Sequence, residues 1–166
     1  MEHPGGDRSG GHSDLIQLMR ALVQRVTEAA VSVEGDPISS IGAGMLVLLG
    51  ITHDDDREVA ERLADKLLAL RIFPDERGRM NEPLADREIL CVSQFTLYGQ
   101  TARGNRPSFT QAAGGEQARA LYEYFCERCR AKQGVFGAHM QVSLVGDGPV
   151  TLLLEVSARA SASPPR

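Results

Sequence analysis

The feature that most constrains the fold is an uninterrupted apolar run at residues 45–51, Met-Leu-Val-Leu-Leu-Gly-Ile. It is far shorter than the roughly 20 residues that a membrane-spanning helix needs. A short apolar run without polar alternation is typical of a strand that is covered on both faces. The run therefore predicts a buried strand inside a layered domain.

Other segments of the chain also have strand character. β-branched and apolar residues alternate or cluster in five further segments, at residues 21–26, 30–33, 89–97, 140–145 and 150–156. The sequence Glu-Gly-Asp-Pro at residues 34–37 predicts a turn between the second of these and Ile38. Gly42, Gly44 and Gly50 fit no nucleotide-binding spacing, so they predict bulges or positions of close packing.

Two segments repeat apolar residues at helical spacing. The first follows three aspartates at residues 54–56, which suit a helix N-terminus, and its stripe is Val59, Leu63, Leu67 and Leu70. The second starts after Gly114 and Gly115, with a stripe of Ala118, Leu121, Tyr122, Phe125 and Cys129. Both stripes predict helices that face a core rather than a ligand. The predicted fold class is α/β, a curled, mostly non-parallel β-sheet with two helices packed on one side.

The chain of 166 residues fits one domain, which we place at residues 19–156. Residues 1–18 are predicted to be either a disordered N-terminal extension or mis-assigned sequence before a start at Met19. Residues 157–166 are low in complexity and predict a disordered tail. The first residues lack the apolar stretch of a secretory signal, which favours a cytoplasmic location.

Metal, disulfide and cofactor chemistry find little support in the sequence. Cys126 and Cys129 form a C-x-x-C pair, but two ligands are half of what structural zinc takes, and the four histidines have no metal-ligand spacing. The pair also falls late in a predicted helix, where a thiolate gains nothing from the helix N-terminus. We therefore expect structural cysteines, no metal and no cofactor. The net charge of −4 argues against a grip on long nucleic acid, although contact with the tip of an RNA remains compatible with it.

Two segments are left unexplained by packing. Ser93-Gln94-Phe95-Thr96-Leu97-Tyr98 places polar side chains at the end of an apolar strand, where they need either backbone partners or a cleft. The second segment, Gly-Asp-Gly-Pro-Val-Thr at residues 146–151, joins two predicted strands. It is either a plain turn or, with a cis bond before Pro149, a rigid backbone wall.

These two segments resemble the two signature motifs of the D-aminoacyl-tRNA deacylase family, formerly called D-tyrosyl-tRNA deacylases. The resemblance covers residues 19–156, and further matching stretches lie in the family's order at residues 20–26, 71–73 with 80–81, and 106–109. One departure is Gly146, where the family usually carries asparagine.

The resemblance implies a homodimer that hydrolyses the ester at the 3′ end of D-aminoacyl-tRNA, and of mischarged glycyl-tRNA. Ser93, Gln94, Phe95 and Thr96 would form the pocket floor of one subunit. Gly148 and Pro149 of the partner would reject L-amino acids by a steric clash with backbone. Arg103 and Arg106 are candidates for phosphate contacts, or else solvated loop residues.

The attacking group stays open at this point. Thr96 is a nucleophile only if a base activates it, and none is near it in the sequence. Water attack assisted by the ribose 2′-hydroxyl, with Thr96 orienting, is the favoured alternative. The competing functions are a non-catalytic nucleic-acid adaptor and, least favoured without a triad, a small-molecule esterase.

Overall fold

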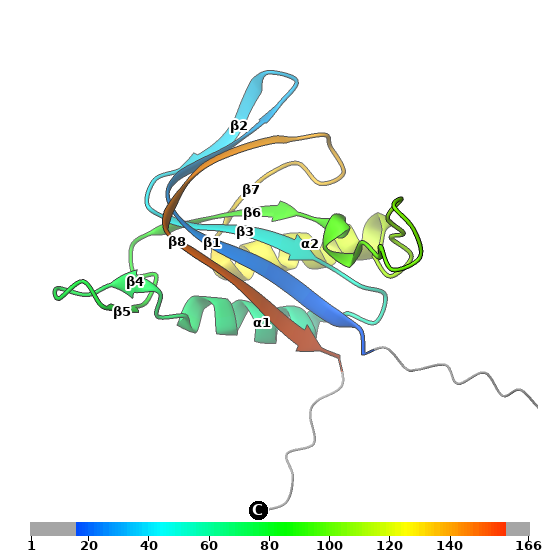
Figure 1. Ribbon diagram of the computed structural model, residues 1–166, viewed down its shortest axis with the longest axis horizontal. Helices are drawn as coiled ribbons and strands as arrows, with labels where there is room; N and C mark the ends of the chain where they lie inside the picture. Colours follow the sequence, from blue (N-terminus) through cyan, green and yellow to red (C-terminus); the bar gives the residue numbers. More distant parts are fainter. Residues whose placement is uncertain (1–15, 159–166) are drawn as a thin grey trace, which may run out of the picture.

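The computed structural model describes residues 16–158, which form a six-stranded sheet, a small hairpin and two α-helices (Figure 1). The tails at residues 1–15 and 159–166, for which we expect disorder, lie outside the described residues. In chain order the elements are β1 (Leu18–Val33), β2 (Asp36–Ile41), β3 (Gly44–Gly50), α1 (Arg57–Ala69), β4 (Phe73–Pro74), β5 (Met80–Glu82), β6 (Glu88–Ser93), the 3₁₀-helix η1 (Phe95–Tyr98), α2 (Gly115–Cys129), β7 (Lys132–Gln133) and β8 (Gln141–Ser157).

The long strand β1 organises the sheet. Along one edge its first half pairs with β3 and its second half with β2, both antiparallel. Along the other edge β8 runs antiparallel to nearly its whole length. The pairs β3–β6 and β6–β7 are parallel. The sheet curls because β1 bends and pairs with different strands along its length (Figure 1). This architecture confirms the predicted fold class.

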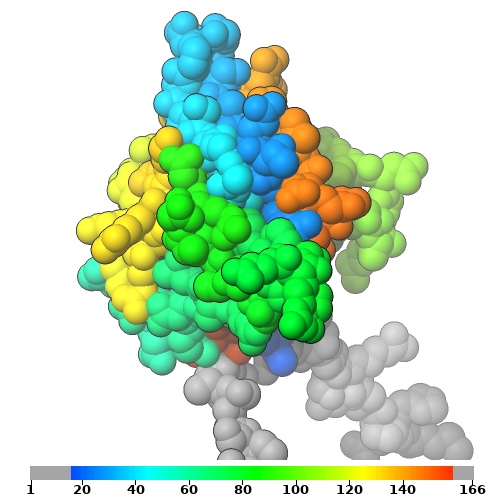
Figure 2. All heavy atoms as spheres, turned by 90° about the vertical axis from the view of Figure 1, so that its left-hand side faces the viewer, coloured from blue at the N-terminus to red at the C-terminus, as the bar shows by residue number. Residues whose placement is uncertain are grey.

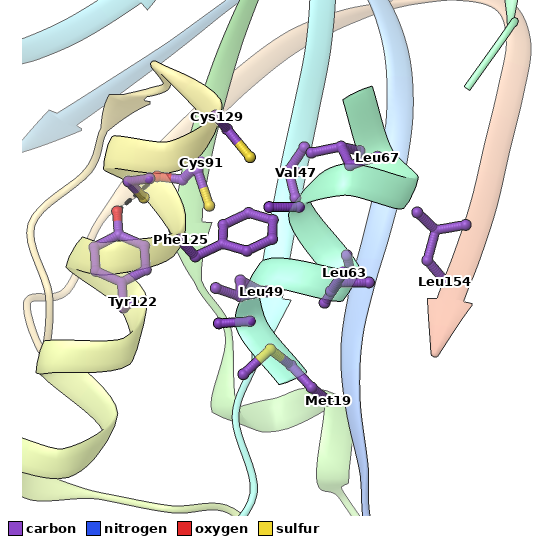
Figure 3. Close-up of a cluster of buried hydrophobic side chains, with 14 of the residues drawn as sticks. Met19, Val47, Leu49, Leu63, Leu67, Cys91, Tyr122, Phe125, Cys129 and Leu154 are labelled. Carbon is purple, nitrogen blue, oxygen red and sulfur yellow. Dashed lines mark hydrogen bonds between the residues drawn. The ribbon is translucent and has the colours of Figure 1, made fainter. Parts of the chain in front are cut away.

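The apolar run of β3 is covered on both faces, as its sequence predicts. Met45, Val47 and Leu49 belong to the main core beneath the two helices, whereas Leu46 belongs to a second cluster on the opposite face. Figure 3 shows side chains of α1, α2 and the strands meeting in the main core, with Phe125 near its centre.

Both helices pack on the same face of the sheet (Figure 1). α2 buries its whole predicted stripe, whereas α1 buries Val59, Leu63 and Leu67 but ends before Leu70, which is half-buried. Asp56 caps α1, because its side chain accepts a hydrogen bond from the Val59 N–H at 3.0 Å. The cysteines are buried in this core, and burial raises the pKa of the Cys129 thiol to about 12, which suits a structural residue. Within residues 16–158 no helix is long and apolar enough to cross a membrane.

Three predicted boundaries are wrong. The strand expected at residues 89–97 ends at Ser93, and the chain then forms η1. The segments 21–26 and 30–33 belong to one strand, because partners continue along both edges of β1. Likewise residues 146–151 do not separate two strands. They lie within β8, where the pairing with β1 is interrupted by a bulge and then resumes.

Candidate active site

The polar segment after β6 turns away from the sheet at Gln94. The Gln94 N–H donates to the Leu49 carbonyl at 2.8 Å, and the Leu97 N–H then donates to the Gln94 carbonyl at 3.3 Å. This ends the strand and starts η1, leaving Phe95 and Thr96 exposed. The Thr96 carbonyl accepts from the Gly99 N–H at 3.0 Å, and the Thr96 hydroxyl accepts a hydrogen bond from the Gln94 side-chain amide.

Long-range contacts hold η1 against the sheet. Arg20 of β1 donates to the Leu97 carbonyl at 2.9 Å, and the Tyr98 hydroxyl donates to the Leu18 carbonyl at 2.7 Å. Gly50 is needed for this close approach, because a Cβ there would lie 2.9 Å from the Tyr98 ring. The predicted close-packing role therefore holds at Gly50.

A cavity of about 490 Å³ opens beside this segment. Its lining includes Ser93, Gln94 and Phe95, and the Phe95 ring packs edge-on against Phe109 with centroids 5.1 Å apart. Three segments far apart in sequence line it: residues 92–95, 109–115 and 136–142. A concave, mainly apolar pocket with a few polar groups suits a small organic moiety such as an aminoacyl group.

The wall at residues 109–115 is fastened to the loop between β3 and α1. The Ala113 N–H donates to the Ile51 carbonyl at 2.9 Å, and the buried Thr52 hydroxyl donates to the Gln111 carbonyl at 2.6 Å. Asp55 in turn accepts from the Thr52 N–H at 2.7 Å. The position of this cavity wall therefore depends on Thr52 and Asp55.

Asp55 is only 4% exposed, and its Oδ1 has no hydrogen-bond partner among the described residues. Burial raises the pKa of its carboxyl to about 7, although the hydrogen bond from Thr52 opposes the rise. In an unfolded chain the carboxyl has a pKa of about 3.9. The folded state thus holds a proton that the unfolded state releases, and the stability that this provides is lost as the pH rises from about 4 to about 7.

The substitution Asp55→Asn should remove this pH dependence, because an amide keeps the acceptor for Thr52 without a charge. Between pH 5 and pH 7 we expect the wild-type free energy of unfolding to fall relative to that of the variant, by up to about 1.4 kcal/mol per pH unit. Urea denaturation at several pH values measures it. The control is Asp86→Asn, an exposed carboxylate that does not contribute to the raised pKa of Asp55, and it should follow the wild type. Parallel curves for Asp55→Asn and wild type would contradict the assignment.

The structure brings some predicted site residues together and leaves others apart. Ser93, Gln94 and Phe95 line the cavity, whereas Thr96 is not among the lining residues and is linked to them by its hydrogen bond with Gln94. Arg103 and Arg106 are exposed in the loop that Gln100 and Ser108 close, outside the cavity lining.

The connection between α2 and β8 also contributes to the cavity, through Phe136, His139 and Met140. None of these three residues was among the predicted site residues. An aromatic residue beside Gly137 was the one local signal for them.

The second predicted motif lies in the bulge of β8. Gln24 pairs with Thr151 and Val26 with Gly146, so residues 147–150 lie opposite Arg25 alone. The Gly148–Pro149 peptide bond is cis, and both residues are exposed. Arg25 supports the bulge from below, through bonds to the Asp147 carbonyl at 3.1 Å and carboxylate at 3.2 Å and to the Ile72 carbonyl at 2.6 Å.

The glycine at position 146 does not weaken this support, because none of these bonds of Arg25 involves Gly146. A Cβ at Gly146 would meet nothing within 4 Å, so there is room for the asparagine that the family usually has.

The two motifs lie apart in the fold. Ser93 pairs with Leu49 of β3, and Leu49 pairs with Ala21 of β1, which is four positions before the residue opposite the bulge. Three strand spacings across the sheet and four residues along it, roughly 20 Å in all, separate the bulge from Ser93. In Figure 1, β8 bends at the left, whereas η1 follows β6 on the right. Figure 2 views the left side, where orange β8 reaches the surface beside the green hairpin of β4 and β5.

Comparisons with known proteins confirm the resemblance to the deacylase family. A family model described as D-Tyr-tRNA(Tyr) deacylase matches residues 22–155. Proteins named D-aminoacyl-tRNA deacylase from Escherichia coli O1:K1 and Shigella boydii serotype 18 are each 53% identical over 145 residues, covering 83% of this chain and all of theirs.

Two solved structures are also similar. One, described as c-Myc DNA Unwinding Element Binding Protein, superposes with a TM-score of 0.79 at 47% identity, covering 84% of this chain and all of that chain. A probable eukaryotic D-amino acid tRNA deacylase superposes with a TM-score of 0.73 at 19% identity and the same coverage, a likeness of fold. With a family model over most of the chain and relatives identical at half of the aligned positions, this chain belongs to the D-aminoacyl-tRNA deacylase family.

Proposed function

We propose that this protein is a cytoplasmic hydrolase that cleaves the ester between a D-amino acid and the 3′ end of its tRNA, leaving L-aminoacyl-tRNA intact. The observation that carries the proposal is the cavity lined by the Ser93-Gln94-Phe95 segment, in a chain of the deacylase family. Glycyl-tRNA is a further substrate, because glycine has no side chain for a steric wall to reject.

A second copy of the chain completes the site. The Gly148-Pro149 segment lies too far from Ser93 to reach the cavity of its own subunit, yet it is exposed and bulges from the sheet. Exposed apolar side chains flank it on β8, at Leu144, Val145, Leu152 and Leu153. Apolar surface beside a protruding segment favours a protein interface. In a symmetric homodimer each bulge would enter the partner's cavity.

If backbone atoms reject the substrate, the enzyme distinguishes D- from L-amino acids without distinguishing one D-amino acid from another. Backbone atoms of Gly148 and Pro149 occupy the space that an L-side chain would take. A D-side chain points out of the cavity, so its size is immaterial. Rejection by a clash needs no contact that is specific to one amino acid.

Water is the attacking group in this proposal, assisted by the substrate's own 2′-hydroxyl. The Thr96 hydroxyl is engaged by the neutral Gln94 amide, which cannot take its proton. Thr96 and Gln94 thus form a hydrogen-bonding pair that orients the ester. An aminoacyl ester is reactive enough for positioning to matter most.

The test is hydrolysis of matched D- and L-tyrosyl-tRNA by the purified protein. We expect release of D-tyrosine and, from the L-substrate, no more than the spontaneous rate. Equal rates on both would contradict selection by a backbone wall. Binding of tRNA without hydrolysis of either ester would favour the adaptor function.

The same reactions, quenched early, examine the role of Thr96. Intact-protein mass spectrometry should show the unmodified chain throughout the D-tyrosyl-tRNA reaction. A mass increase equal to one tyrosyl group, absent from a Thr96→Ala variant, would identify Thr96 as a nucleophile.

A further inference from the structure

The cavity has one ionisable side chain in its lining. Among the described residues that form it, His139 alone can carry a charge, and the others are apolar, glycine, serine or glutamine. His139 is also exposed, which places its ring at the mouth of the cavity and not at its base. Such a ring meets whatever part of a ligand leaves the cavity.

The backbone around His139 is fixed by its own contacts. The Gly134 N–H donates to the Cys91 carbonyl of β6 at 3.1 Å, and the Ala138 N–H donates to the Val135 carbonyl at 3.2 Å. Met140 packs so closely on Gly134 that a Cβ there would lie 2.7 Å from its sulfur. Since both ends of this short loop are anchored, His139 is held beside the cavity.

A second basic side chain lies next to this part of the cavity lining. The Arg119 guanidinium of α2 stacks over the Phe136 ring, 5.1 Å from its centroid, and Phe136 lines the cavity. The ion pair of Arg119 with Glu116 spans 3.9 Å, and the Glu116 side chain is 94% exposed. An ion pair this open to water contributes little, so the guanidinium is available to another anion.

We infer that His139 and Arg119 form a basic rim that binds the phosphates preceding the terminal adenosine of the substrate tRNA. The inference rests on the proposed function, in which the cavity holds the aminoacylated end. The RNA backbone must then leave the cavity past exposed His139, and the Arg119 guanidinium, stacked on the lining residue Phe136, lies near this path. The chain as a whole carries a net charge of −4, so attraction for RNA has to come from local cations.

The two basic side chains differ in what they contribute. A guanidinium is always charged and can bind a phosphate with two parallel hydrogen bonds. An imidazole ring can donate a hydrogen bond to a phosphate oxygen from a ring N–H. The charged groups that α2 places against this loop are Arg119 and Glu116.

The test is steady-state kinetics of the full chain on D-tyrosyl-tRNA. For Arg119→Gln we expect KM to rise about threefold to tenfold, with kcat within twofold of wild type. His139→Gln should also raise KM, and His139→Lys should restore a low KM. The slope of log(kcat/KM) against log salt should become shallower by about 0.7 for each phosphate that the variant no longer binds.

The matched control is Arg128→Gln. Arg128 lies on the same helix and makes an exposed ion pair with Asp65 at 3.0 Å, but it is not near the cavity lining. It changes the net charge by the same amount, and KM should stay at the wild-type value. Unchanged KM and salt dependence in both rim variants, with an active wild type, would overturn the inference. A loss in kcat alone for His139→Gln would also overturn it, because the ring would then act on the reacting groups. An inactive wild type would instead refute the proposed function.

Discussion

Replacing Gly148 with valine should reduce kcat/KM for D-tyrosyl-tRNA by on the order of 100-fold or more, because in the proposed dimer its backbone shares the partner's cavity with the substrate. Any side chain there would occupy the space of the aminoacyl group. Gly148 also has φ +125°, and its Cβ would lie 2.9 Å from a Val150 methyl carbon and 3.1 Å from the Arg25 guanidinium. Since Gly148 is exposed, the free energy of unfolding should fall by only about 1–3 kcal/mol.

The control for this variant is Gly146→Asn on the same strand. Its Cβ meets nothing within 4 Å, so the variant should keep both activity and stability. Hydrolysis assays and urea denaturation measure the two properties separately. A folded Gly148→Val protein with wild-type activity would show that this segment does not enter any active site.

Mixed dimers test whether each bulge enters the cavity of its own subunit or that of the partner subunit. Two differently tagged chains are co-expressed and purified through both tags, with Ser93→Phe as the variant that fills the cavity. If each bulge enters the partner's cavity, Ser93→Phe paired with Gly148→Val has one site with both defects and one intact site. Such dimers should have about half of the wild-type activity, as expected when one of two independent sites is intact.

The reciprocal arrangement gives the opposite result. A chain that carries both substitutions, paired with a wild-type chain, has one defect in each site and should be inactive. If each bulge instead served its own subunit, the split pair would be inactive and this pair would retain half of the activity. Each variant alone, as a homodimer, supplies the inactive baseline.

Replacing Gly44 with alanine should lower the free energy of unfolding by at least about 3 kcal/mol. Gly44 pairs with Glu88 where the parallel strands β3 and β6 begin. A Cβ at this position would lie 1.8 Å from the Glu88 carbonyl oxygen and 2.8 Å from its carbon. These are backbone atoms of a paired strand, so they cannot move aside without separating β3 from β6.

Gly42→Ala is the matched control for this effect, two residues earlier in the chain. A Cβ at Gly42 meets nothing within 4 Å, and its unfolding free energy should stay within about 0.5 kcal/mol of wild type. Urea denaturation followed by circular dichroism compares the two. Equal stability of both variants would mean that β3 and β6 can part at Gly44 without cost.

Much of the layered fold follows from local pattern. The sequence shows α1 and α2 because the residues that a helix buries against a core recur with the helical period. It shows β3 because a strand that is covered on both faces is apolar at successive positions. The capping aspartate of α1 was predicted as one of three, but the pattern did not distinguish the exposed cap Asp56 from the buried Asp55. Asp55 is buried because it bonds to the Thr52 N–H, and Thr52 is in turn bonded through its hydroxyl to the Gln111 carbonyl of a distant segment.

Where the sequence misled, a distant partner overrode a local signal. Phe95 and Leu97 alternate with polar residues and so continue the strand pattern, yet the Leu49 carbonyl, Arg20 and Tyr98 fix a 3₁₀-helix there. The Gly-Pro pair at residues 148–149 indicates a turn, yet β1 is long enough for pairing with β8 to resume beyond it.

The family and its two motifs could be recognised without the fold, because each motif is a short string whose residues and spacing are visible in the chain. That Phe109, Phe136 and His139 share one cavity with Ser93, and that Gly148 lies away from it, became clear from the three-dimensional arrangement alone. Local spacing encodes which side chains face a core. The meeting of loops from residues 92–95, 109–115 and 136–142 depends instead on strand register and on hydrogen bonds between segments far apart in the chain.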